Sequence, residues 1–252
     1  MKPVLFSIFG LKVQGYGTMI AAGIFAALLL LGYRAKKRNY DEDSILNMSI
    51  IAIICGILGG KLLYLMTEIK NITQNPDILK NIGAGFVIYG AIIGGALGVL
   101  YYSKRKNWNV LKIFDLIIPS IALAQGIGRI GCFLAGCCYG KQTNLPWGVE
   151  FKNSLYAPAG VLRHPTQIYS SIFDILLAVF LLRYDKKERK DGRVFSMYVI
   201  IYAVGRFLVE FLRDDPRGNV GVLSTSQFIS IITLTFGIIL YNINKFKKTR
   251  NI

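Results

Sequence analysis

The stretch GIGRIGCFLAGCCYGKQTNLPWGVEF, residues 126–151, decides how the chain is interpreted. It begins inside an apolar run and carries Arg129 at a depth where hydrocarbon normally excludes a charged side chain. It continues into a segment rich in glycine and cysteine, which cannot extend an ordinary helix. Irregular backbone at membrane depth is tolerated only where it is buried in protein or lines a wet cavity. We therefore expect a functional site in this stretch.

The composition places the stretch in a membrane protein. The chain has 252 residues, of which 53% are hydrophobic, and a net charge of +16, whereas a soluble basic protein is rarely so apolar. Seven apolar runs, several near the roughly 20 residues that span a bilayer, lie at 15–33, 45–66, 83–103, 111–131, 166–183, 193–212 and 225–243. We predict an all-α fold: a single polytopic membrane domain over residues 1–252, a bundle of seven transmembrane helices. Because the basic excess fits a membrane topology, we expect no nucleic-acid partner.

The basic residues orient the predicted helices. The connections after the first, third and fifth runs, with the residues that flank them and the C-terminal tail, hold 18 lysines and arginines, against nine in the N-terminus and the other connections. The positive-inside rule therefore predicts an external N-terminus and a cytoplasmic C-terminus. We expect no cleavable signal peptide, and the first run is interpreted as a retained helix. Residues 1–14 are expected to be a short external segment, partly amphipathic, along the membrane surface.

Several charged residues lie inside the apolar runs, among them Lys61, Arg129 and Asp174. Arg129 follows Gln125 by one turn on the same helix face and nears the outer leaflet, where a planar guanidinium suits a lipid phosphate. Pairing of Arg129 with a buried carboxylate is the alternative. Lys61 is expected to extend outward to the surface. Asp174, in the middle of its run, must face the bundle interior and find a partner.

The sixth run is a second charged stretch. Tyr202, Arg206, Glu210 and Arg213 follow one another at spacings of 4, 4 and 3, which places them on one helix face. Arg206 and Glu210 are expected to form an ion pair, and Arg213 to lie near the external surface. If this helix is adjacent to the one with Arg129, the two arginines make a basic pocket for an anionic lipid headgroup. The seventh run shows no obvious chemistry.

The cysteines allow two interpretations. Besides Cys55, the chain has Cys132, Cys137 and Cys138, whose C-x4-C-C spacing is not the paired C-x2-C zinc pattern and has no second ligand pair after it. We therefore expect no metal and no cofactor. One interpretation is structural packing or a disulfide between Cys132 and either Cys137 or Cys138. The other is a catalytic thiolate beside Arg129.

Five segments, in order and spacing, resemble the bacterial prolipoprotein diacylglyceryl transferase family. They are ILGGKLLY at 57–64, VIYGAIIGG at 87–95, DLIIPSIALAQGIGRIGCFLAGCCYG at 115–140, RHPTQIY at 163–169 and YAVGRFLVEFLRDD at 202–215. The resemblance implies transfer of the diacylglyceryl group of phosphatidylglycerol to the lipobox cysteine thiol of a prolipoprotein, with release of glycerol phosphate. It also implies a multi-pass enzyme of the bacterial plasma membrane that works at the outer leaflet. The partners would be membrane lipid and the signal peptide that carries the lipobox.

The resemblance also suggests functional residues. The catalytic candidates are Arg129, Arg206, Glu210, Tyr89 and Tyr202. The substrate-binding candidates are Arg129, Tyr16, Gln125, Cys132, Cys137, His164 and Gln167. His164 is the only histidine of the chain, and a structural, hydrogen-bonded histidine is its other interpretation.

The chain departs from the family motif GRxGNFxNxE. Cys132 and Ala135 replace its two asparagines, Cys137 replaces its glutamate, and Tyr89 stands where the family has a histidine. Deprotonation of a thiol with a pKa of about 8.5 needs little help near neutral pH, so these losses need not abolish transfer. Three hypotheses follow: the transferase itself, a related membrane enzyme with Cys137 or Cys138 as nucleophile, and a non-catalytic paralogue that binds anionic phospholipid.

Overall fold

The computed structural model describes residues 4–8, 11–74, 85–152, 154, 156–215 and 218–246. The chain divides into two compact units, Met1–Leu31 with Phe114–Ile252, and Gly32–Ile113. We call the first the site unit and the second the helix-pair unit. A single domain over the whole chain stays a prediction.

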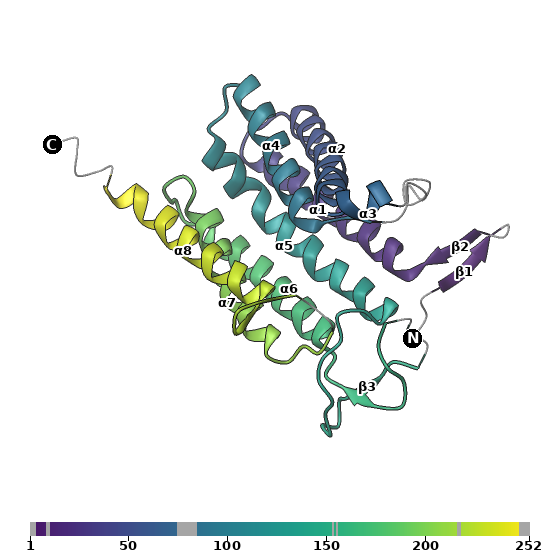
Figure 1. The fold of residues 1–252 in the computed structure, drawn as a ribbon. Helices are drawn as coiled ribbons and strands as arrows, with labels where there is room; N and C mark the ends of the chain where they lie inside the picture. The colour runs from purple at the N-terminus through teal and green to yellow at the C-terminus, as the bar shows by residue number, and fades with distance from the viewer. Residues whose placement is uncertain are drawn as a thin grey trace. The chain divides into compact units, whose positions relative to one another are not determined.

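Within the described residues, a long helix forms at each of the seven apolar runs, so the all-helical prediction is confirmed (Figure 1). These helices are α1 (Gly15–Lys37), α2 (Glu42–Thr67), α4 (Ile88–Arg105), α5 (Val110–Ala135), α6 (Thr166–Tyr184), α7 (Arg193–Glu210) and α8 (Thr225–Phe246). The start of the third run, from residue 83, lies outside the described residues. A short helix, α3 (Ile69–Gln74), follows α2 and was not expected.

Five of the described helices are long and apolar enough to cross a membrane: α1, α2, α5, α6 and α8 up to Ile243. α4 is 18 residues long and ends in Lys104 and Arg105, while α7 contains Arg193, Arg206 and Glu210. These charges keep both helices below the apolar content typical of a span. The chain is therefore consistent with a polytopic membrane protein, whereas the number of seven spans and the sides of the termini stay predictions.

Three short antiparallel ladders accompany the helices. β1 (Val4–Ile8) pairs with β2 (Leu11–Gln14), directly before α1. The short N-terminal segment, expected to be partly amphipathic, therefore contains two paired strands. β3 (Val149–Glu150) pairs with β4 (Leu162–Arg163), and β5 (Asn219–Val220) pairs with β6 (Leu223–Ser224).

In the helix-pair unit, glycines let the backbones of α2 and α4 touch. A Cβ on Gly56 would lie 3.3 Å from the carbonyl oxygen of Ala91, and one on Gly94 would overlap the carbonyl oxygen of Cys55. The glycines of α2 and α4 therefore form a packing face of small residues. Lys61 Nζ donates a 2.9 Å hydrogen bond to the carbonyl of Gly85.

In the site unit, α5 contacts α1 on one face and α6 on another. A Cβ on Gly23 of α1 would lie 2.9 Å from the carbonyl oxygen of Ala124 of α5, so these two backbones nearly touch. Ser171 Oγ of α6 donates a 2.7 Å hydrogen bond to the carbonyl of Gly126. A buried apolar core joins α5, α6 and α7: Ile118, Ala122, Leu177, Ala178, Leu181, Val194, Tyr198 and Val199. α8 packs on α7, where a Cβ on Gly237 would lie 2.9 Å from the side chain of Val199.

A buried carboxylate fixes the start of α7 against α5. Asp115 accepts hydrogen bonds from the backbone N–H groups of Gly192 and Phe195, both at 2.7 Å. A carboxylate at a helix N-terminus satisfies orphan donors and complements the helix dipole. Gly192 turns the chain into the helix with a φ of 84°, in the region that favours glycine. Asp115 of α5 therefore fixes where α7 begins, and with it the positions of the charged residues along α7.

We predict opposite effects for two helical Gly→Ala substitutions. Gly94→Ala forces a methyl group into the backbone of Cys55, and overpacking of this kind costs about 1–3 kcal/mol of the free energy of unfolding. Gly32→Ala has no atom within 4 Å of its new Cβ and should gain up to about 1 kcal/mol from helix propensity. Thermal unfolding in detergent would measure both variants. Equal shifts in the two variants would contradict the close contact of α2 with α4.

Candidate functional site

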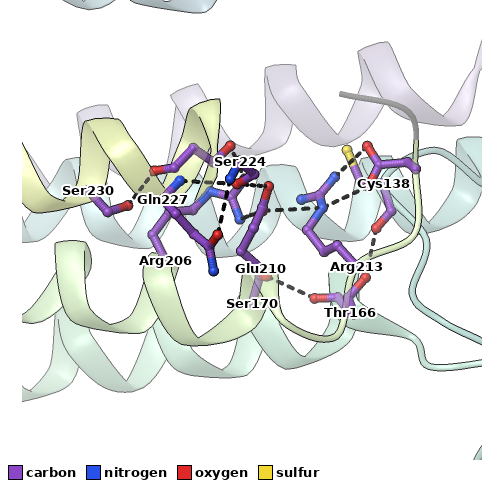
Figure 2. A network of polar contacts seen from close by, with 11 residues as sticks. Cys138, Thr166, Ser170, Arg206, Glu210, Arg213, Ser224, Gln227 and Ser230 are labelled. Carbon is purple, nitrogen blue, oxygen red and sulfur yellow. Dashed lines mark hydrogen bonds and ion pairs between the residues drawn. The ribbon is translucent and has the colours of Figure 1, made fainter. Parts of the chain in front are cut away.

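A network of charged and hydroxyl side chains runs along α7 (Figure 2). Arg206 Nη1 lies 2.7 Å from Glu210 Oε2, one turn away, and only 15% and 5% of the two side chains are exposed. The predicted ion pair is thus confirmed. Removal of one partner from a buried pair leaves an uncompensated charge, so each side chain holds the other in place.

The start of α8 completes this network. Arg206 Nη2 donates to Ser226 Oγ at 2.8 Å, and Ser224 Oγ donates to Glu210 Oε1 at 2.8 Å. Gln227 accepts from the backbone N–H of Ser224 at 3.1 Å. The sequence interpretation of the seventh run as chemically silent is therefore wrong: its first turn orders the ion pair of α7. The cluster of Ser, Thr and Gln at residues 224–227 was the available signal.

Arg213 extends the network beyond the end of α7. Its side chain is 4% exposed and binds Asp215 through two hydrogen bonds of 2.8 and 2.9 Å. Its Nε lies 3.9 Å from Glu210 Oε2, and its guanidinium also hydrogen-bonds the thiol of Cys138. A polar cavity of about 350 Å³ opens beside it, lined by Lys141, Glu210, Phe211, Arg213, Asp215, Asn219, Val222, Ser224 and Gln227.

Arg129 lies near the C-terminal end of α5, and its guanidinium has no hydrogen-bond or ion-pair partner in the part of the chain that the structure describes. Its electrostatic neighbours are Tyr202, Cys132, Cys138 and Asp174. A cation without an assigned acceptor, beside a polar cluster, is available to bind an anion. The sequence places Arg129 near the end of the fourth apolar run, and the structure has it near the end of the corresponding helix α5.

Asp174 connects the two arginines. The residue is 2% exposed, and both Arg129 and Arg206 interact with its carboxylate electrostatically. The expectation that this mid-helix carboxylate faces the interior is confirmed, whereas a direct partner for it stays a prediction. The alternative interpretation of Arg129 was pairing with a buried carboxylate. No ion pair between Arg129 and Asp174 occurs among the described residues, so their interaction is only a longer-range one.

Tyrosines and an amide surround the arginines. Tyr198 Oη donates a 2.7 Å hydrogen bond to Gln125 Oε1, and Tyr202 stacks on Tyr198 with ring centroids 5.4 Å apart. Tyr16, at the start of α1, packs by its backbone against Gly131 and is 45% exposed. It interacts electrostatically with the three clustered cysteines and with Arg129. The structure therefore brings these sequence-predicted residues into one region.

The end of α5 explains why the cysteines cluster. Gly136 has a φ of 73°, its N–H donates to the carbonyl of Phe133 at 3.2 Å, and the N–H of Cys137 donates to the carbonyl of Cys132 at 3.2 Å. These two bonds and the left-handed glycine make a Schellman C-cap. The motif folds Cys137 back over Cys132 across five residues. Cys138 follows with a φ of 62°, which is uncommon outside glycine.

The three sulfur atoms of Cys132, Cys137 and Cys138 lie within 4.8 Å of one another. Hydrogen bonds from Cys132 and Cys137, together with the charge of Arg213, hold the pKa of Cys138 below its ordinary value despite burial. Hydrogen bonds to Cys132 and Cys138, and then burial, raise the pKa of Cys137. The described residues contain no disulfide among the cysteines, and Cys138 is the thiol that the cluster favours as a thiolate.

Two of the predicted substrate-binding residues, Gln167 and His164, contact the segment that follows α5, and their role in substrate binding stays a prediction. Gln167 is 1% exposed and donates from Nε2 to the carbonyl of Cys137 at 2.7 Å, and Thr166 Oγ1 donates to the carbonyl of Cys138 at 2.7 Å. His164 exchanges backbone hydrogen bonds with Gly140 and Lys141. Its Nδ1 lies 3.3 Å from Tyr169 Oη, which supports the structural interpretation of this histidine.

Tyr89 belongs to the helix-pair unit and is 40% exposed. Its catalytic role stays a prediction. Sequence reasoning missed Ser224 and Ser226 as partners of the ion pair. It also missed Asp215 as the partner of Arg213.

The chain is similar in sequence to proteins of one known family. The model of the family "Prolipoprotein diacylglyceryl transferase" matches residues 3–243. The chain is 67% identical to a phosphatidylglycerol–prolipoprotein diacylglyceryl transferase of Clostridium tetani over 98% of this chain and 100% of the relative. It is 57% identical to a protein named phosphatidylglycerol–prolipoprotein diacylglyceryl transferase 2 of Clostridium perfringens, over 98% of this chain and 97% of the relative. It is 37% identical to the transferase of Clostridioides difficile, over 100% of this chain and 98% of the relative.

Loss of the α7 carboxylate should destabilise the fold. Glu210→Ala leaves the buried Arg206 without its carboxylate, and we expect a loss of about 3–5 kcal/mol in the free energy of unfolding. Ser224→Ala removes one hydrogen bond to a charged group and should cost about 1.5–3 kcal/mol. Thr235→Ala, at an exposed hydroxyl of α8, is the matched control. A melting temperature of Glu210→Ala equal to that of the control would show that the pair does not support the fold.

Proposed function

Because the chain belongs to the prolipoprotein diacylglyceryl transferase family, we propose that it transfers the diacylglyceryl group of phosphatidylglycerol to the lipobox cysteine thiol of a prolipoprotein. Glycerol phosphate is the leaving group. One structural observation supports this assignment above the others. The Arg129 guanidinium has no hydrogen-bond or ion-pair partner among the described residues, and it interacts at longer range with Asp174, the buried carboxylate that also interacts with Arg206.

In this proposal Arg129 binds the phosphate of the donor lipid. A planar guanidinium can form two parallel hydrogen bonds with phosphate oxygens, which fixes the orientation of the headgroup. Asp174 offsets part of the charge of the two arginines before the lipid arrives. When the lipid binds, its anionic phosphodiester offsets the positive charge of Arg129. Gln125 and Tyr202 are placed to order the headgroup around it.

The chemical step is a displacement at carbon. The sulfur of the acceptor thiolate attacks the carbon of the diacylglyceryl group that bears the phosphate ester oxygen. The carbon–sulfur bond forms, the carbon–oxygen bond breaks, and the electron pair leaves on that oxygen as glycerol phosphate. Because the leaving phosphate gains a negative charge, a cation beside it stabilises the transition state more than the ground state. Arg206, held by Glu210 and Ser226, is the preorganised second cation.

The proton of the acceptor thiol must leave before or during attack. Tyr202 is an electrostatic neighbour of Arg129 and is our candidate for assisting this transfer. Tyr89 remains the alternative from the helix-pair unit. A thiol with a pKa of about 8.5 loses its proton readily near neutral pH, so this assistance contributes less than the arginines.

We also propose the cellular setting. The enzyme would span the bacterial plasma membrane several times and work at the outer leaflet, with membrane lipid and the lipobox segment of a signal peptide as partners. The apolar helices and the distribution of lysine and arginine support this orientation.

Loss of the donor-binding arginine should abolish most activity. Arg129→Ala should lower kcat/KM by about 10²–10³-fold, the effect of losing one donor that stabilises transition-state charge. Purified protein would receive phosphatidylglycerol and a lipobox peptide, and the diacylglyceryl mass gain of the peptide would be followed over time. Arg183→Ala, at an exposed end of α6, is the matched control and should keep full activity. Unchanged transfer by Arg129→Ala would refute the role of this residue.

A mass adduct on the enzyme itself would support the other hypothesis. If Cys137 or Cys138 acted as a nucleophile, quenched reactions would contain enzyme that carries a lipid-derived group on one cysteine. Direct transfer predicts no such adduct and a peptide product only.

A further inference from the structure

We propose that Cys132, Cys137 and Cys138 bind one zinc ion through their thiolates, and that the open coordination position of this ion binds the thiolate of the acceptor cysteine. The second part rests on the proposed transfer to a thiol; the metal site itself does not. The C-x4-C-C spacing predicted no zinc site, because that spacing lacks two ligand pairs. The folded geometry changes this expectation.

The first argument is distance. The three sulfur atoms lie within 4.8 Å of one another, and zinc–sulfur bonds of about 2.3 Å at tetrahedral angles place sulfurs about 3.8 Å apart. The sulfur–sulfur distances therefore need to shorten by about 1 Å or less, which rotation of the cysteine side chains can provide. A disulfide would use two of these sulfurs, whereas a metal ion uses all three.

The second argument is the backbone that presents the sulfurs. The Schellman cap at Gly136 brings Cys137 back to Cys132, and the left-handed conformation of Cys138 turns the third thiol to the same place. A non-glycine residue at a positive φ costs free energy and persists where the surroundings hold it. Gln167 and Thr166 hold the carbonyls of Cys137 and Cys138. The convergence of the thiols is therefore fixed by the fold.

The third argument is charge. A site made of one zinc ion and three thiolates has a formal charge of −1, and a fourth thiolate makes the site more negative. Arg213 hydrogen-bonds the thiol of Cys138, and Arg129 is an electrostatic neighbour of Cys132 and Cys138. Cationic and hydrogen-bonding groups around the ligands orient them and tune the metal. The two arginines thus offset the charge of a thiolate-rich site.

The coordination is incomplete, which favours a reactive site over a structural one. Among the described residues, no fourth cysteine, histidine or carboxylate joins the three sulfurs. Structural zinc sites have four protein ligands, whereas catalytic sites have three and an exchangeable position. All three cysteines are only partly buried, so a ligand from outside can approach.

An acceptor thiol fits this position chemically. A thiol that coordinates zinc is deprotonated outright, and its proton leaves to solvent. The resulting thiolate would lie beside Arg129, where the donor phosphate is proposed to bind. Its sulfur then forms the bond to the glyceryl carbon, and the thioether product, no longer a thiolate, is a weaker ligand that dissociates. The cysteines would thus replace the missing asparagine and glutamate of the family motif with a metal.

The first experiment measures the metal. Protein purified under reducing conditions, stripped with a chelator and reloaded with zinc should hold about one ion per chain by elemental analysis, as a single site requires. Cys132→Ser and Cys137→Ser should each lose most of this zinc. Cys55→Ser in α2 is the matched control and should keep it. Thermal unfolding of each variant would show that it is folded.

The second experiment follows the acceptor without any turnover. Cobalt in place of zinc reports its ligands through thiolate charge-transfer absorption. A lipobox peptide should increase this absorption in the wild type, and the same peptide with Cys→Ser should not. Removal of zinc should lower the transfer rate by at least about tenfold, because even mutation of residues that only hydrogen-bond to metal ligands has an effect of this size. Addition of zinc should restore the rate.

The outcomes separate the two proposals. Absence of stoichiometric zinc, or two cysteines joined in a disulfide under the same conditions, overturns the metal site, while intact transfer leaves the proposed function standing. Bound zinc with no spectral response to the peptide and no effect of removal on transfer overturns the acceptor step. Bound zinc and a peptide response without any transfer would contradict the proposed function alone.

Discussion

Compensation of positive charge inside an apolar helix bundle governs the site unit. Arg206 is buried, and a buried charge is tolerated only when it is paired and hydrogen-bonded. Glu210 supplies the carboxylate, Ser226 accepts a further hydrogen bond, and Ser224 holds the carboxylate in turn. This requirement brings the start of α8 to the end of α7. Arg129 differs, because the described residues give it only longer-range neighbours, and this difference underlies our proposal that Arg129 binds a ligand.

Much of the fold was readable from apolar runs, because a helix that spans a bilayer must be long and continuous. All seven runs contain helices, and the four-residue spacing of Arg206 and Glu210 gave their ion pair directly. The N-terminal ladder was missed because alternation over strands of five and four residues is weak beside a long apolar run. Ser224 and Ser226 were missed because their partners lie on another helix. Spacing along one chain segment cannot show such contacts.

The cysteine segment shows the same limit more sharply. From sequence, a C-x4-C-C pattern spreads its thiols around a helix end without a common direction. The Schellman cap folds Cys137 over Cys132, and the backbone of Cys138 turns its thiol into the same cluster. His164 and Gln167, which were predicted to bind substrate, also hydrogen-bond to this segment, and spacing along the chain did not show these contacts. Where the family motif has amide and carboxylate groups, this chain therefore gathers three soft ligands beside two arginines.

The proposed function depends above all on binding of an anionic lipid phosphate by Arg129. Native mass spectrometry of the detergent-purified protein, with equal amounts of phosphatidylglycerol and phosphatidylcholine, tests it most directly. We expect preferential retention of one phosphatidylglycerol by the wild type, loss of this preference in Arg129→Ala, and its persistence in the Arg183→Ala control. Equal retention of the two lipids by the wild type, or an unchanged preference in Arg129→Ala, would contradict it.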